Sequence, residues 1–182
     1  MTPFILDAHA LSANDYPEWY QGYVALSQES GISALLSNTV PVTEELFSKA
    51  PTNWLRGSYA LGKWTPLQLL EHIADAELIF ATRLLALLRK HNVAWPGFDE
   101  NLFVENGQAH QLGAEHLLLR MQAVRQTTLL LANEVHADNQ HDRIVANGNS
   151  VSALALLAIT AGHHQHHLNI LHQRYPLSIE HS

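Results

Sequence analysis

The chain has 182 residues, of which 47% are apolar and 15% are charged, and its formal net charge is −7 with histidine counted as neutral. This composition supplies a hydrophobic core for one domain and excludes an intrinsically disordered chain. The acidic charge argues against nucleic acid as the main partner, because binding to phosphates requires a basic surface. The absence of cysteine excludes disulfide bonds, thiolate metal ligands and a cysteine nucleophile.

Neither a targeting segment nor a membrane span is expected. Residues 1–20 lack a basic region followed by an apolar run, so they do not match a secretory signal. The longest nearly apolar run, at 151–161, is far shorter than the roughly 20 residues that a membrane-spanning helix requires. We therefore expect a soluble, cytoplasmic protein with no membrane partner.

The first third of the chain carries weak helix signals. Residues 1–19 are expected to form an irregular or loosely attached N-terminal arm. A mixed apolar stripe predicts a helix over 20–37, although Gly31 lowers the helix propensity there by about 1 kcal/mol relative to alanine. Pro41 is expected to begin a new helical turn, and residues 50–63, rich in proline, asparagine and glycine, are expected to form a loop.

The next helix has a defined start. Thr65 can cap it, and Pro66 suits the first helical position. The apolar spacing predicts that this helix continues to about Lys90. One row of its core-facing stripe contains Leu69, His72, Ala76, Ile79 and Arg83. His72 therefore lies at the edge of the face that packs into the core.

Two further long helices complete the pattern. A long connection at 92–112, with a short helix expected at 101–106, precedes a helix predicted over 114–135. Connections of this length in a compact domain are often functional. After a polar segment, Asn149 or Ser150 is expected to cap a last helix that runs to about residue 173.

These elements predict an all-α, up-down four-helix bundle with a long connection between its second and third helices. The prediction depends on four long amphipathic segments and on the lack of a convincing alternating strand. The bundle domain is expected at 20–176, between the arm at 1–19 and a C-terminal tail at 177–182.

A cluster of histidines in the last helix predicts a metal site. His163 and His167 are four residues apart, so they lie one turn apart on the same helix face. Two imidazoles at that spacing can bind one divalent metal, and His72 is the best candidate for a third ligand. Three neutral imidazoles suit zinc, nickel, copper or iron, and they leave coordination positions open for water or substrate.

Other interpretations of the same residues remain open at this point. His163 and His166 form a rival pair at a spacing of three. A lone histidine such as His72 is more often a core residue bonded to a carbonyl. The C-terminal histidines can also form a solvated face, since one helix cannot point all four to one side. Asp75, about one turn beyond His72, is a candidate to orient that imidazole or to accept a proton from a metal-bound ligand.

Three stretches of the sequence resemble the DinB-like superfamily of four-helix bundles. They are residues 59–77, which contain Gly62-Lys63-Trp64-Thr65-Pro66 and His72, residues 95–101, which read Trp95-Pro96-Gly97-Phe98-Asp99-Glu100-Asn101, and residues 161–168, which read Ala161-Gly162-His163-His164-Gln165-His166-His167-Leu168. The resemblance covers about residues 20–175. It implies that His72, His163 and His167 are the metal ligands and that the protein forms a homodimer.

Members of that superfamily transfer low-molecular-weight thiols, isomerise maleylpyruvate or are suspected hydrolases. The resemblance therefore implies a zinc- or nickel-dependent enzyme that transfers a small thiol or hydrolyses a small substrate, with the metal lowering the pKa of a bound thiol or water. The alternative is a non-catalytic interaction or stress-response protein that is stabilised by metal. A deep, open cavity at the metal would favour the enzyme, and a closed shell of ligands would favour the alternative.

Overall fold

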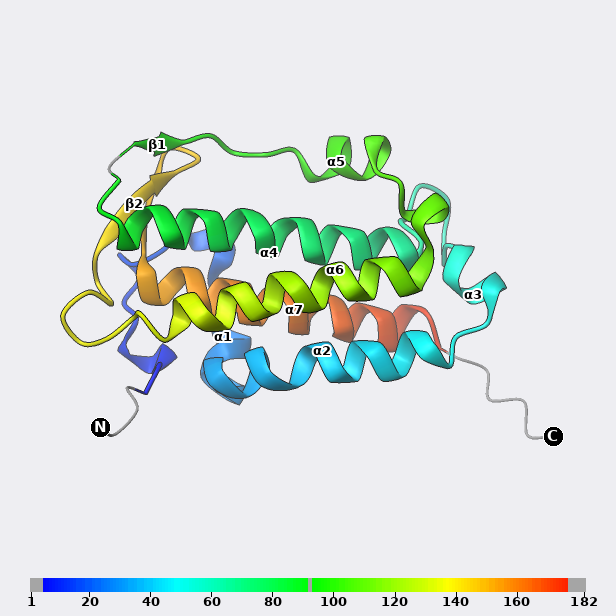
Figure 1. The fold of residues 1–182 in the computed structure, drawn as a ribbon, viewed down its shortest axis with the longest axis horizontal. Helices are drawn as coiled ribbons and strands as arrows, with labels where there is room; N and C mark the ends of the chain where they lie inside the picture. The colour runs from blue at the N-terminus through cyan, green and yellow to red at the C-terminus, as the bar shows by residue number, and fades with distance from the viewer. Residues whose placement is uncertain (1–4, 92, 177–182) are drawn as a thin grey trace.

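Four long helices form a bundle in the structure, a computed structural model that describes residues 5–91 and 93–176 (Figure 1). The helices are α1 (Gln21–Ser30), α2 (Ile32–Ser48), α3 (Thr52–Arg56), α4 (Pro66–Leu88), α5 (Glu100–Asn106), α6 (Ala109–Ala132) and α7 (Ala153–Arg174). The strands are β1 (Ala94–Trp95), β2 (Arg143–Ala146) and β3 (Asn149–Ser152). The tail expected at 177–182 lies outside the described residues.

The bundle is built from α2, α4, α6 and α7. Helix α4 packs against α6 and α7, α2 packs against the same two helices, and α1 packs against α7. The connection between α4 and α6 returns along the bundle, so these two helices start at the same end and run in the same direction (Figure 1). The predicted four-helix bundle and its long connection are thus confirmed. None of the helices in the described parts of the chain is long and apolar enough to cross a membrane.

The start of α4 follows the sequence prediction. The Thr65 hydroxyl accepts a hydrogen bond from the backbone N–H of Gln68 at 3.3 Å, and the Gln68 side chain accepts one from the Thr65 N–H at 2.9 Å. This reciprocal capping box satisfies two backbone donors that have no partner within the helix. It fixes the register of α4, and with it the direction in which His72 points.

The first predicted helix is broken at a different residue from the one we expected. Gly31 has a φ of +83°, a conformation that strains any residue with a side chain, and it separates α1 from α2. Pro41 does not start a helix but lies inside α2. Ser37, whose carbonyl loses its helical donor at Pro41, is exposed, as is Pro41 itself, so water can solvate that carbonyl.

A small sheet at one end of the bundle was not predicted. Strand β2 pairs parallel with β1 and antiparallel with β3. The hairpin turns at Asn147 and Gly148, whose φ angles are +51° and +72°, as a tight two-residue hairpin requires. Asn149 and Ser150, the expected caps of the last helix, therefore belong to β3, and Ser152 caps α7 instead by accepting from the Ala155 N–H at 3.2 Å.

The segment before α1 contains two short 3-10 helices, η1 (Ala8–Ala10) and η2 (Glu18–Tyr20), and it is packed against the bundle. Ala8, Leu11 and Tyr16 are buried and belong to the same hydrophobic cluster as α7. The buried carboxylate of Asp15 accepts from the Arg143 guanidinium at 2.7 Å. This segment therefore covers one end of the core, while its separation from the bundle as an arm at 1–19 stays a prediction.

Gly162 allows α7 to approach α1 closely beside the histidine cluster. A Cβ atom at this position would lie 1.9 Å from the backbone oxygen of Tyr23. Replacing Gly162 with alanine is therefore expected to push the two helices apart and to lower the free energy of unfolding by about 1–3 kcal/mol.

Thermal unfolding followed by circular dichroism measures this effect, with Gly22→Ala as the matched control. Gly22 lies in α1, and a Cβ atom there would have no neighbour within 4 Å. Alanine is the better helix former, so the control is expected to be as stable as the wild type or slightly more so. Equal melting temperatures for the two variants would show that the contact between α1 and α7 adapts without cost.

Candidate metal centre

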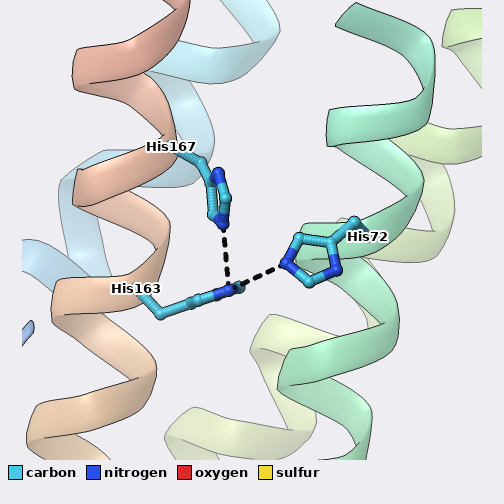
Figure 2. Close-up of side chains that lie close together, drawn as sticks. All are labelled: His72, His163 and His167. Carbon is cyan, nitrogen blue, oxygen red and sulfur yellow. Dashed lines mark hydrogen bonds between the residues drawn. The ribbon is translucent and has the colours of Figure 1, made fainter. Parts of the chain in front are cut away.

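Three imidazole rings from two helices converge in the structure. His72 extends from α4, and His163 and His167 extend from α7 (Figure 2). The Nε2 atom of His163 lies 3.0 Å from Nε2 of His72 and 3.1 Å from Nε2 of His167. One ligand atom from each ring lies within 4.8 Å of the others, which is the arrangement of a candidate metal site.

The three rings are almost completely buried. Their exposed fractions are 6% for His72, 5% for His163 and 7% for His167. Burial lowers the pKa of His72 to about 4. Burial also holds the pKa values of His163 and His167 well below their usual value, with a further contribution from the neighbouring imidazoles. All three rings are therefore neutral near pH 7, which is the form that binds a metal.

Hydrogen bonds between the rings cannot account for both of these short distances. Nε2 of His163 faces two other Nε2 atoms, but an imidazole nitrogen carries either one proton or one lone pair, directed along one line in the ring plane. A single proton can serve only one of the two contacts well. A cation between the three nitrogens would accept all three lone pairs, so the donor set fits a divalent metal of the kind that imidazole prefers.

Aromatic side chains, rather than hydrogen bonds, hold the rings in place. The Trp64 ring packs on His72 with centroids 4.9 Å apart, and Tyr23 packs edge-on against His163 at 5.3 Å. The Nδ1 atoms of His72 and His167 are buried and have no hydrogen-bond partner in the described part of the chain. These packing contacts orient the rings but leave their far nitrogens without an acceptor.

The role expected for Asp75 is therefore corrected. Its carboxylate forms an ion pair with Arg120 of α6 and does not contact His72. It lines a separate open hollow together with Glu71 and Arg120. Asp75 lies three residues after His72, which places it about 60° away around the helix axis, on the side of α4 that faces α6.

The remaining two histidines of the cluster lie elsewhere. His164 is fully buried, and its ring contacts the guanidinium of Arg125 at 2.9 Å and the hydroxyl of Thr43 at 2.8 Å. His166 is half-buried and packs against Tyr23 with centroids 5.2 Å apart. The rival pair of His163 and His166 is thus not brought together at the convergent nitrogens.

A cavity of about 360 Å³ opens beside the three rings. Its lining residues come from the helices α1, α4, α5 and α7, from the segments before α1 and before α4, from the connection after β1 and from the β2–β3 turn: Trp19, Tyr20, Tyr23, Trp64, His72, Ala76, Phe80, Arg83, Gly97, Phe98, Glu100, Asn147, His163 and His167. Tyr23, Arg83 and Asn147 carry no motif that predicts a functional role. Their elements meet only in the folded chain, so no local spacing marks them.

The fold and the convergent histidines define a helical bundle with a candidate metal centre between two of its helices. The family model of the DinB superfamily matches residues 35–171, and the chain belongs to that superfamily. This membership confirms the family resemblance seen in the sequence.

Among solved structures, the chain is similar to YfiT from Bacillus subtilis, with a TM-score of 0.66 and 18% sequence identity over 78% of this chain and 82% of YfiT. YfiT is described as a probable metal-dependent hydrolase with an unusual four-helix bundle topology. At this level of identity the similarity shows a shared fold. A comparison with curated protein sequences gave no match.

Proposed function

We propose that His72, His163 and His167 bind one divalent metal, zinc or nickel, and that the protein is a metal-dependent hydrolase of small molecules. The observation that carries the proposal is the position of the three Nε2 atoms, which converge at the wall of a cavity rather than inside a sealed core. The similarity to YfiT supports it, because that protein is described as a probable metal-dependent hydrolase.

A divalent metal at this position would supply a Lewis acid that lowers the pKa of a bound water or thiol. The chain's own residues would bind the substrate and move protons. Burial raises the pKa of Tyr23, with Tyr20 and Glu100 contributing, so its phenol keeps its proton and can donate a hydrogen bond to the substrate. Glu100 is the carboxylate among the lining residues, and we propose it as the proton acceptor in place of Asp75.

Two alternatives to a hydrolase, a thiol transferase and a non-catalytic protein, are outcomes that the test can distinguish. Transfer of a low-molecular-weight thiol would use the same metal and the same cavity. A non-catalytic, metal-stabilised protein would need neither an open coordination position nor a cavity, so the space beside the histidines favours an enzyme. The homodimer implied by the family resemblance is likewise a proposal, and light scattering of the purified protein would test it.

A turnover assay of the metal-loaded protein tests this function. The protein, purified without an affinity tag or a metal column, would be incubated with a panel of small esters and amides, and in parallel with cellular thiols and monochlorobimane. We expect hydrolysis that falls to background in His163→Ala. The matched control is His166→Ala, whose ring lies outside the convergent nitrogens, and it should keep most of the activity.

Each outcome of the assay has a distinct meaning. Thiol conjugation without ester or amide hydrolysis would identify a transferase. Hydrolysis that persists unchanged in His163→Ala would exclude the metal as the catalyst. A lack of any turnover at full metal content would favour the non-catalytic alternative.

A further inference from the structure

Arg83 is a buried cation in the wall of the cavity. Its exposed fraction is 4%, and its guanidinium uses Nη2 to donate to the backbone oxygen of Pro96 at 2.8 Å. The Nε atom is buried and has no hydrogen-bond partner among the described residues. The guanidinium also lies beside the Tyr20 side chain, and its Cζ atom lies 6.0 Å from the centroid of the Phe80 ring. A guanidinium has five N–H donors, so donors remain for a further acceptor.

The other buried charges are balanced within the described parts of the chain. Glu77 pairs with Arg125 at 2.7 Å, Asp15 pairs with Arg143 at 2.7 Å, and Glu71 accepts from two backbone N–H groups at 3.1 Å. Arg83 is the buried arginine there that forms no ion pair with a carboxylate. An unpaired buried charge is costly, so its persistence in a cavity wall indicates a partner that is not part of the chain.

The position of Arg83 on α4 places it at the other end of the cavity from the histidines. It lies eleven residues after His72, which corresponds to three turns of helix and a rotation of about 20° from the same face. The two α-carbons are thus separated by roughly 16 Å along the helix. Side chains on a helix lean toward its N-terminus, so the guanidinium reaches back toward His72.

The wall between these two ends is mainly aromatic. Trp19, Tyr20, Tyr23, Trp64, Phe80 and Phe98 line it. Asn147, in the hairpin turn, lines the cavity together with Arg83 and adds an amide that can donate a hydrogen bond. The carboxylate of Glu100 also lines the cavity, but Glu100 is exposed to water, whereas Arg83 is not.

We propose that Arg83 binds a carboxylate of the substrate, so that the cavity accepts an elongated acid with an aromatic or apolar body and its anionic end remote from the three histidines. This assignment names the substrate class of the proposed hydrolase and rests on that function for its biological meaning. The contact between Arg83 and the carboxylate does not depend on the metal. A guanidinium suits this role because its planar donors match the two oxygens of a carboxylate.

The test measures binding to the metal-free protein, so it is independent of the metal and of turnover. The probes are phenylacetate, phenylpropionate and phenylbutyrate, each compared with its uncharged amide, and the signal is tryptophan fluorescence, because Trp19 and Trp64 line the cavity. In the wild type we expect at least one acid to bind about 10- to 100-fold more tightly than its amide, as a charge-assisted hydrogen bond predicts.

Arg83→Met is expected to remove this difference, because the acid should bind more weakly while the amide binds as before. Arg83→Lys, which keeps the charge but not the planar fork, should retain part of the preference. The matched control is Arg89→Met, at the end of the same helix, where the side chain pairs with Glu134 in solvent. It should bind both probes like the wild type.

Three results would overturn the proposal. One is equal binding of acids and amides by the wild type, and another is an acid preference that survives in Arg83→Met. The third is an equal loss of affinity for acid and amide in both Arg83→Met and Arg83→Lys, with unchanged melting temperatures. That pattern would mean that Arg83 only holds the connection in place through Pro96. Failure of the metal hypothesis would leave all of these measurements unaffected.

Discussion

Replacing His72 with alanine is expected to abolish tight metal binding while the bundle stays folded. His72 forms no hydrogen bond except its contact with His163, and its Nδ1 atom has no partner in the described structure. Its loss removes the packing of Trp64 on the ring, which costs some stability, but it breaks no hydrogen bond to the rest of the fold. Loss of a mere hydrogen-bond partner of a metal-bound histidine weakens metal binding about 10–100-fold, so loss of a ligand should weaken it by more than about 100-fold.

Metal content and thermal unfolding together check this expectation. A ligand present at 100 times its dissociation constant stabilises the folded state by about 2.7 kcal/mol. For a chain of this length, that corresponds to a rise in melting temperature of about 5–11 °C. We expect saturating zinc to produce such a rise in the wild type and in His166→Ala, and none in His72→Ala.

The measurement also separates a catalytic metal from a structural one. If His72→Ala unfolds, or if a chelator unfolds the wild type, the metal is required for the fold, as in small zinc domains. If His72→Ala still binds one zinc per chain as tightly as the wild type, the three histidines are not the ligands.

The histidine cluster shows how much of the site can be predicted from local spacing. His163 and His167 lie one turn apart, and a capped start fixes the register of the helix that presents His72. These signals are local, so they could be recognised along the chain. The choice between His166 and His167, by contrast, depends on how α7 is rotated against α4, which is a property of packing and not of spacing.

The two errors have different physical origins. Asp75 was placed near His72 from helical position alone, but α6 presents Arg120 to it, and opposite charges attract more strongly than a neutral imidazole does. The β2–β3 hairpin did carry a signal, since Asn147-Gly148 between short alternating strands is a typical hairpin turn. Its strands of four residues were too short to outweigh the helical pattern.

A buried network on α6 is expected to make the bundle sensitive to the loss of a single charged side chain. The guanidinium of Arg125 donates to both carboxylate oxygens of Glu77, at 2.7 and 2.8 Å, and to the backbone oxygen of Leu36 at 2.7 Å. It also contacts Nδ1 of His164 at 2.9 Å. The network therefore joins α2, α4, α6 and α7, next to the helix turn that carries His163.

The direction of these bonds explains why His164 cannot be a metal ligand. Because Arg125 is a donor, Nδ1 of His164 accepts, and its Nε2 then carries the proton. That proton is donated to the hydroxyl of Thr43, 2.8 Å away, and the Thr43 hydroxyl in turn donates to the Thr39 carbonyl at 2.8 Å. His164 is thus fully used in the core and has no nitrogen left for a metal.

Arg125→Met is expected to lower the free energy of unfolding by about 3–5 kcal/mol, because it leaves the buried carboxylate of Glu77 without a partner. For a chain of this length that is a fall in melting temperature of about 6–20 °C. The matched control is Arg120→Met, also on α6, whose partly exposed pair with Asp75 should contribute about 1 kcal/mol or less. Thermal unfolding followed by circular dichroism compares the two variants.

A double variant, Arg125→Met with Glu77→Met, tests the cause. Replacement of a whole buried ion pair by apolar side chains is often neutral, whereas removal of one partner is not. The double variant should therefore be more stable than Arg125→Met, although His164 still lacks the donor to its Nδ1 atom. If the double variant is as unstable as Arg125→Met or less stable, the unpaired carboxylate is not the main cause, and the bonds from Arg125 to Leu36 and His164 carry the effect.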